Sequence, residues 1–322
     1  DYQANFAYNT PSYPADRMNA FEYATAVNNL NQSLGYGVNS FKNPEEMAEI
    51  AANVDSYTDW EREMLKKYAS QSEHTISLSG GNERIKIFSS LNYLTQDGIT
   101  KGNSLRYDRY NYRSNVNSNF DEIGLAIGMG VNGTLTDERY PNASAYTIYS
   151  RIRDRNPFEK PYNLDGTISN QFDNPALILE SPGYIKLRTV YNQAALNLNW
   201  DIPWVRGLSV GMDGNYNITS QDRVDWIEKA PYYDEDGNAT YQNPSDISVS
   251  RSSYQQHRYD LNFRIDYKNT FAGNHNVLAT FVHNRQYYHG TSLSAYANTF
   301  YTNAIHQLQK GDAASITASN GE

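Results

Sequence analysis

The chain has 322 residues, of which 39% are hydrophobic and 13% aromatic, with a net charge of -9. The negative charge argues against a nucleic-acid backbone as a partner, and the absence of cysteine excludes disulfides and Cys-ligated zinc. No run of about 18 apolar residues occurs, so we expect no transmembrane helix. The 28 tyrosines favour half-exposed strand surfaces, because the ring is apolar and the hydroxyl is polar.

Alternation of apolar and polar residues recurs along the chain and predicts nine β-strands, because successive strand side chains point to opposite faces. The clearest example is RYDLNFRIDY, which sets Leu261, Phe263 and Ile265 on one face and charged or amide side chains on the other. The predicted strands are 2–8, 75–79, 85–93, 109–117, 125–135, 194–202, 208–218, 258–267 and 276–288.

Short and long connections alternate between these strands. The long ones are 11–74, 95–106, 136–186, 219–253 and the segment from 289 onward. In an up-and-down antiparallel sheet, all short turns then lie at one end, which is typical of outer-membrane barrels with short periplasmic turns and long extracellular loops. We therefore predict an all-β fold, a transmembrane antiparallel β-barrel segment whose apolar face meets lipid and whose polar face meets the lumen.

Aromatic residues cluster near two of the predicted short turns, as expected of an interfacial girdle. They are Trp200, Trp204, Tyr267 and Phe271. The alternative is that the same aromatics fill the core of a soluble β-rich protein.

Two helices are predicted inside 11–74, which we interpret as a helical extracellular loop insertion. The first is 15–30, and the second is 57–70, which begins with a capping box of Thr58 and Glu61. The apolar face of the second helix would consist of Trp60, Met64 and Tyr68. We expect both helices to pack over the end of the barrel.

An ordered set of short motifs is similar to one known family. Its first members are Trp60, His74, Ser79-Gly80-Gly81, Tyr93-Leu94 and Gly98-Ile99. Its later members are Arg109, Tyr110, Arg113 and Asn115, then Pro203, Trp204, Gly207 and Leu208, then Phe271, Gly273 and His275. Through these residues nearly the whole chain resembles the SusC/RagA-like, TonB-dependent outer-membrane transporters of Bacteroidetes.

The resemblance implies a nutrient importer in the outer membrane that takes up oligosaccharides or peptides together with a SusD-like surface lipoprotein. It also implies a single receptor-like barrel domain across 1–322, with the plug, the segment that contacts TonB and the C-terminal strands outside this sequence. The strand-like start at Asp1 and the loop-like composition of ITASN lead to the same expectation, that the chain is a segment of a longer protein.

No catalytic constellation or cofactor motif is found, so an enzyme is not expected. The acidic stretch YYDEDGNATY lacks the glutamate that would complete an EF-hand, and a solvated turn at Asp236-Gly237 explains it better. The six histidines have no metal-ligand spacing. Paired carboxylates such as Glu45-Glu46 and Asp121-Glu122 lie beside turn or helix-start signals, so helix capping explains them.

Aromatic residues in the long loops are the candidate substrate-binding residues, because aromatic faces stack on sugar rings. We single out Trp226, Tyr232, Tyr233, Tyr146 and Tyr149. The same residues could instead pack the loops against each other or contact the lipoprotein. The competing function is a soluble β-rich module that binds glycans or proteins.

Overall fold

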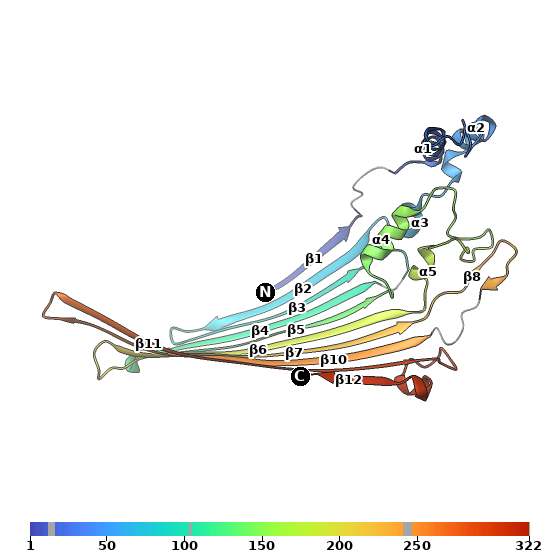
Figure 1. Ribbon diagram of the computed structural model, residues 1–322. Coiled ribbons are helices and arrows are strands. Elements are labelled where there is room, and N and C mark those ends of the chain that lie inside the picture. Colours follow the sequence, from blue (N-terminus) through green and yellow to red (C-terminus); the bar gives the residue numbers. More distant parts are fainter. Residues whose placement is uncertain (12–16, 103–104, 241–246, 322) are drawn as a thin grey trace.

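The computed structural model describes residues 1–11, 17–102, 105–240 and 247–321, and one curved antiparallel sheet dominates it (Figure 1). Within the described residues this sheet has ten strands, in the order β1-β2-β3-β4-β5-β6-β7-β10-β11-β12. Their bounds are β1 (Tyr2–Asn9), β2 (Ala69–Gly81), β3 (Ile85–Asp97), β4 (Arg106–Phe120), β5 (Leu125–Tyr140), β6 (Tyr184–Asp201), β7 (Leu208–Ile227), β10 (Ser248–Phe271), β11 (His275–Asn298) and β12 (Thr317–Gly321). A small hairpin pairs β8 (Tyr232–Tyr233) with β9 (Ala239–Thr240).

All nine predicted strands are present, and most extend well beyond their predicted bounds. Three strands were not predicted. The two strands of the β8–β9 hairpin are too short to show a period, and Thr317–Gly321 lacks apolar alternation. The prediction that ITASN is loop is therefore wrong, because backbone pairing with β11 makes it a strand.

Short and long connections lie at opposite ends of the sheet, as predicted (Figure 1). The short ones join β2 to β3, β4 to β5, β6 to β7 and β10 to β11. The first of these requires glycine: Gly81 has φ +151, and a Cβ there would meet the Ile85 carbonyl oxygen at 2.2 Å. The long connections carry all the α-helices found in the described residues.

The strand register gathers the predicted apolar positions on one face of the sheet. One row runs from Ile87 through Val116 and Met129 to Leu196. The next strands continue it, because Leu196 and Leu261 both lie opposite Gly214. Leu91, Met129 and Leu261 on this face are exposed, so we call it the apolar face.

The height of the apolar face fits a bilayer. On β5 its apolar residues run from Leu125 to Leu135, a span of roughly 33 Å at about 3.3 Å per residue. A strand tilted by about 35–45° would turn this length into a band of about 25 Å, the height seen in outer-membrane barrels.

The opposite face of the sheet is polar and carries ladders of side-chain amides. Asn92 donates to Glu73 at 3.0 Å, Asn111 donates to Asn92 at 3.0 Å, and Thr134 donates to Asn111 at 2.8 Å. Similar bonds join Asn197 to Asp213 and Asn284 to Asn262. The two faces thus differ as the sequence predicted.

Helices form at the long-connection end: α1 (Ala20–Ser33), α2 (Pro44–Ala52), α3 (Trp60–Met64), α4 (Ala145–Asp154) and α5 (Ala176–Leu179). The helix predicted for 15–30 is α1, which starts later, behind an Asn19–Glu22 capping box, while residues 15 and 16 lie outside the described residues. Glu46 serves in the capping box of α2, so the capping interpretation of Glu45-Glu46 is confirmed, although the helix itself was not predicted.

The helix predicted for 57–70 is mostly wrong. Only Trp60–Met64 is helical, its N-cap is Asp59 rather than Thr58, and Leu65 instead pairs with Thr100. Tyr68 consequently lies outside the helix, and β2 already begins at Ala69, so residues 69–74 belong to the sheet. Along the described parts of the chain, no helix is long and apolar enough to cross a membrane.

Candidate binding surface at the long-loop end

The long connections pack into one layer over the end of the sheet. Its buried core combines Trp60 and Met64 of α3 with Ile148 and Ile152 of α4. Residues from the connections around Ile99, Leu179 and Ala230 complete it. Trp60 also donates from Nε1 to the Asn156 carbonyl oxygen at 2.9 Å, which ties together segments far apart in sequence. This packing fixes the loops as a structured surface.

Arg17 ties the connection between β1 and β2 to the connection between β5 and β6. Its guanidinium donates to the carbonyl oxygens of Ile152, Arg153 and Arg155 at 2.7, 2.5 and 2.9 Å. A cation at the C-terminus of α4 satisfies carbonyls that lack helical partners and complements the helix dipole. Burial lowers the pKa of Arg17, and the neighbouring carboxylates of Glu61 and Asp59 oppose that shift.

We expect Arg17→Gln to loosen α4 locally. Hydrogen bonds from a charged group contribute about 1.5–3 kcal/mol, which corresponds to roughly 10- to 100-fold faster amide exchange in the last turn of α4. Hydrogen exchange measured by mass spectrometry would show this. Arg206→Gln, at an exposed turn at the other end of the sheet, is the control. Unchanged protection in α4 would refute the capping role.

A groove of about 1140 Å³ lies between α3 and the segment that precedes α1. It carries charges of both signs, namely Asp55, Asp59, Glu61 and Glu63 together with Arg17, Arg62, Lys66, Lys67, Lys101 and Arg155. Burial raises the pKa of Glu61, while Arg17 acts in the opposite direction. An arrangement of this kind can hold a ligand that itself carries both charges. The groove could not be predicted from the sequence, because residues 57–70, which form much of it, were expected to be one regular helix.

Trp226 is not available to a ligand in this structure. It has no exposed surface and packs on Tyr184, Val249 and Phe300. The ring of His306 stacks on the indole of Trp226 with 3.9 Å between ring centroids, and the indole Nε1 donates to the Glu228 carboxylate at 2.7 Å. Its position in a predicted polar loop suggested ligand contact, whereas in this structure it packs against the loop that follows β11.

The other four candidate residues lie in two separate places. On α4, Tyr146 is 82% exposed and lies on the side opposite the buried isoleucines, and Tyr149 is 36% exposed and lies on the flank of the helix. On the β8–β9 hairpin, Tyr232 packs against the loop-layer core, and Tyr233 is half-buried. None of the four lines the charged groove.

The acidic stretch after Tyr233 is a turn, as predicted. The Asp234 carboxylate accepts from the backbone and side-chain nitrogens of Asn238, which lowers the pKa of Asp234. Gly237 follows with φ +79. In the described regions, no three His, Asp or Glu side chains group as metal ligands.

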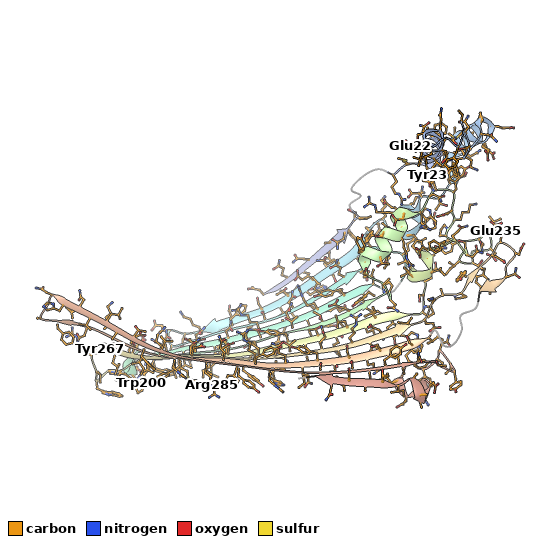
Figure 2. The ribbon with its side chains drawn as sticks, in the orientation of Figure 1. Glu22, Tyr23, Trp200, Glu235, Tyr267 and Arg285 are labelled. Carbon is orange, nitrogen blue, oxygen red and sulfur yellow. The ribbon has the colours of Figure 1, made fainter. Side chains whose placement is uncertain are left out.

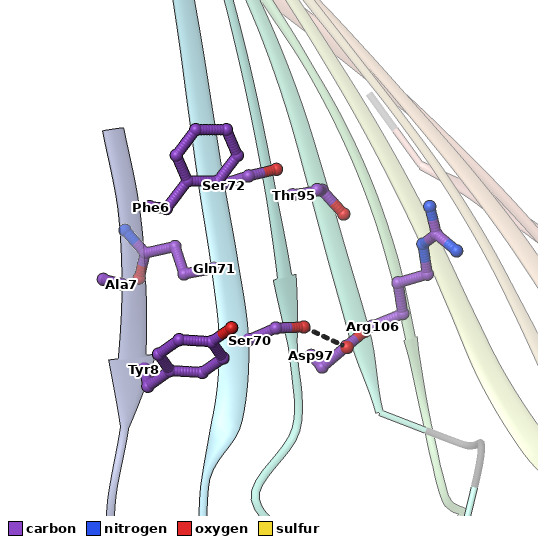
Figure 3. Close-up of a pocket in the computed structure, with 9 residues that line it drawn as sticks. All are labelled: Phe6, Ala7, Tyr8, Ser70, Gln71, Ser72, Thr95, Asp97 and Arg106. Carbon is purple, nitrogen blue, oxygen red and sulfur yellow. Dashed lines mark hydrogen bonds between the residues drawn. The ribbon is translucent and has the colours of Figure 1, made fainter. Parts of the chain in front are cut away.

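A shallow recess of about 290 Å³ lies at the β1 edge of the sheet, near its long-loop end (Figure 3). Phe6 and Tyr8 border it, and Ser70 donates to the Asp97 carboxylate at 2.6 Å. Arg106 closes its far side. The register places Tyr8, Ser70, Asp97 and Arg106 on the apolar face. We call the apolar part of this face, which runs from Leu125 to Leu135 on β5, the apolar belt. Between this belt and the long loops, the same face is polar.

Comparisons with known proteins support the fold. No family model matches the chain, and no curated protein matches it in sequence. Among solved structures it is similar to the RagAB peptide importer in the "closed-closed" state, with TM-score 0.70, and in the "open-open" state, with TM-score 0.66. A further structure of the RagAB peptide transporter gives TM-score 0.68.

Each alignment covers 99% of this chain and 38% of the other, at 16% identity. The chain therefore spans well under half the length of these neighbours. Its fold matches a β-barrel segment of a RagA-like transporter, which confirms the fold class expected from the sequence.

Proposed function

We propose that this chain forms part of the wall and the outer end of a SusC/RagA-type nutrient importer in the outer membrane. The observation that carries the proposal is the ten-stranded sheet with one apolar and one polar face and with its long connections at one end. An exposed apolar face this wide requires lipid or protein to cover it. The structural neighbours, which are transporters, support the same reading and favour transport over catalysis.

Peptides are the substrate class that we favour over oligosaccharides. The RagAB neighbours are a peptide importer by name, and the groove beside α3 carries both acidic and basic side chains. A peptide presents a cationic and an anionic end together with backbone amides, which matches such a surface. Tyr146, Tyr149, Tyr232 and Tyr233 remain proposed substrate contacts outside this groove. Energy would come from TonB through parts of the protein outside this chain.

A surface lipoprotein of the SusD type is the proposed protein partner. Figure 1 shows α1 and α2 projecting away from the sheet at the long-loop end. Ala20 and Ala24 lie on the buried side of α1. Five large apolar side chains before, on and after α1 are exposed, namely Met18, Leu30, Leu34, Tyr36 and Val38. Exposed apolar side chains of this kind are suited to anchor a partner protein.

We expect Leu34→Asp with Tyr36→Asp to weaken co-purification of the lipoprotein at least tenfold, while the barrel still folds. Both side chains are exposed, at 62% and 72%, so the change leaves the core intact. Leu164→Asp is the matched control, because Leu164 is fully exposed at 101% on a different loop. Full retention of the lipoprotein by the double variant would rule out this surface.

Topology can be tested with epitope tags at three glycines of equivalent geometry. Gly166, Gly237 and Gly273 have φ of +84, +79 and +74, with no atom close to an added Cβ. The first two lie in long connections and the third in a short turn. On intact cells carrying the full-length protein, antibody should reach tags at the first two and reach the third only after the outer membrane is opened. The reverse pattern would invert the topology.

The competing proposal is a soluble β-rich binding module. Its apolar face would then need a protein layer to cover it. Detergent dependence separates the two: an importer barrel aggregates without detergent, whereas a soluble module stays monodisperse.

A further inference from the structure

Basic side chains form a register row on the apolar face, at the long-loop end of the sheet. Arg106 on β4 lies directly opposite Arg139 on β5, and Arg139 lies directly opposite Lys186 on β6. Two strands further on, Arg251 occupies the same row, since Lys186 and Arg251 both lie opposite Val224. All four side chains are exposed.

Asp97 lies directly opposite Arg106 in this row, whereas Asp108 and Asp137 lie one step closer to the apolar belt, so most of the row is unpaired. Asp108 pairs with Arg106 at 2.8 Å, and Asp137 pairs with Arg188 at 3.3 Å. Among the described residues, Arg139, Lys186 and Arg251 have no carboxylate within salt-bridge distance. Like charges directly opposite each other destabilise a sheet, so an anion bound across the row would offset this repulsion.

Arg139 and Lys186 converge on one tyrosine, while Arg251 donates to the His306 carbonyl oxygen at 3.3 Å. The guanidinium carbon of Arg139 lies 4.9 Å from the ring centre of Tyr184, and Lys186 Nζ lies 4.8 Å from it. Tyr184 is buried in the cluster with Trp226 and Phe300, so it is a fixed platform. Tyr184 thus holds two cationic groups close to one ring, and both side chains remain exposed.

The position of the row suits the headgroup region of a membrane. Two tyrosines mark the end of the apolar belt on the same face. Tyr93 stacks on Tyr110 with 4.7 Å between ring centroids, and both lie in the register row of Leu135 and Val190. Aromatic rings of this kind mark the membrane interface. Arg139 and Lys186 lie four residues beyond Leu135 and Val190 on their strands, outside this aromatic level.

We propose that Arg139, Lys186 and Arg251 bind the phosphorylated headgroup of an outer-leaflet lipid on the outside of the barrel. The inference rests on the proposed placement of the apolar face in lipid. The acyl chains of the bound lipid would lie against the apolar belt below, and its phosphate would separate the opposed cations. Guanidinium and ammonium groups are the usual partners of phosphate in proteins.

The test uses the full-length protein in detergent with diphosphoryl lipid A or inorganic phosphate as the probe, and native mass spectrometry to count bound molecules. We expect Arg139→Gln with Lys186→Gln to lower the affinity for lipid A roughly 25-fold, because each surface cation attracts an anionic lipid by about a factor of five. The matched control is Lys86→Gln with Arg113→Gln, which removes the same charges from the polar face and should leave lipid binding unchanged.

The unfolding temperature provides a second test, because the double variant should shift it in opposite directions, relative to the wild type, without and with lipid A. Without lipid, the double variant should unfold at the same or a higher temperature than the wild type, because it removes opposed like charges. With lipid A, only the wild type and the control should gain stability. Equal lipid A affinity in all three proteins would overturn the proposal, as would equally tight binding of inorganic phosphate alone. Heat-modifiable migration of the same samples shows whether the protein folds as a barrel. A protein that forms no barrel would contradict the importer proposal, whereas a folded barrel without lipid A binding would contradict only the lipid site.

Discussion

Trp226→Ala is expected to destabilise the end of the sheet by about 3–5 kcal/mol, the usual cost of emptying a buried tryptophan site. The indole is fully buried between Val249 and Phe300, and it stacks on His306. Its loss would also leave the Glu228 carboxylate without the donor that lies at 2.7 Å. Denaturant unfolding in detergent and limited proteolysis of the 299–316 connection would measure the effect.

Trp204→Ala is the matched control for this experiment. Trp204 is 73% exposed and makes one aromatic contact, with Trp200 at 5.5 Å between ring centroids. We expect its replacement to change stability by no more than about 0.5 kcal/mol, as for other exposed sites. If Trp226→Ala instead preserved stability and abolished substrate binding, Trp226 would be a ligand contact after all.

Phe263→Arg in the full-length protein is expected to impair membrane insertion. Phe263 lies on the apolar face, opposite Met212, and an arginine facing lipid near the bilayer midplane costs about 2–4 kcal/mol. The fraction of heat-modifiable, folded protein in the outer membrane should fall accordingly. Asn262→Arg is the matched control on the polar face, where Asn284 contacts it, and it should insert normally. Equal folded fractions for both variants would contradict the assignment of the faces.

The strands and their faces could be predicted from the sequence because a period of two is a local property. The register is uninterrupted from β2 to β11. The alternation of apolar and polar residues within each strand therefore gives the whole sheet one apolar and one polar face. Figure 2 places Trp200 and Tyr267 at the short-turn end and Glu22 and Tyr23 at the opposite end, in line with the expected girdle.

The loops could not be predicted in the same way, because long-range contacts decide them. The segment after Met64 has a helical pattern, yet Leu65 pairs with Thr100 and the chain turns into β2. Trp226 looks like a ligand contact in a polar loop until Phe300, far along the chain, is seen to cover it. The basic row was equally hidden, because Arg139 and Lys186 become neighbours only through the register.

The most direct test of the account measures which residues of β10 meet lipid. This segment contains no cysteine. Spin labels are therefore attached to single cysteines introduced at Leu261, Asn262, Phe263, Arg264 and Ile265 of the reconstituted full-length protein, with any cysteine outside the segment replaced by serine. Collisions with oxygen, which concentrates in lipid, and with a water-soluble nickel complex are then compared at each site. We predict strict alternation, with oxygen collisions favoured at 261, 263 and 265 and nickel collisions favoured at 262 and 264. Uniform nickel accessibility at all five positions would contradict it and would identify a soluble protein.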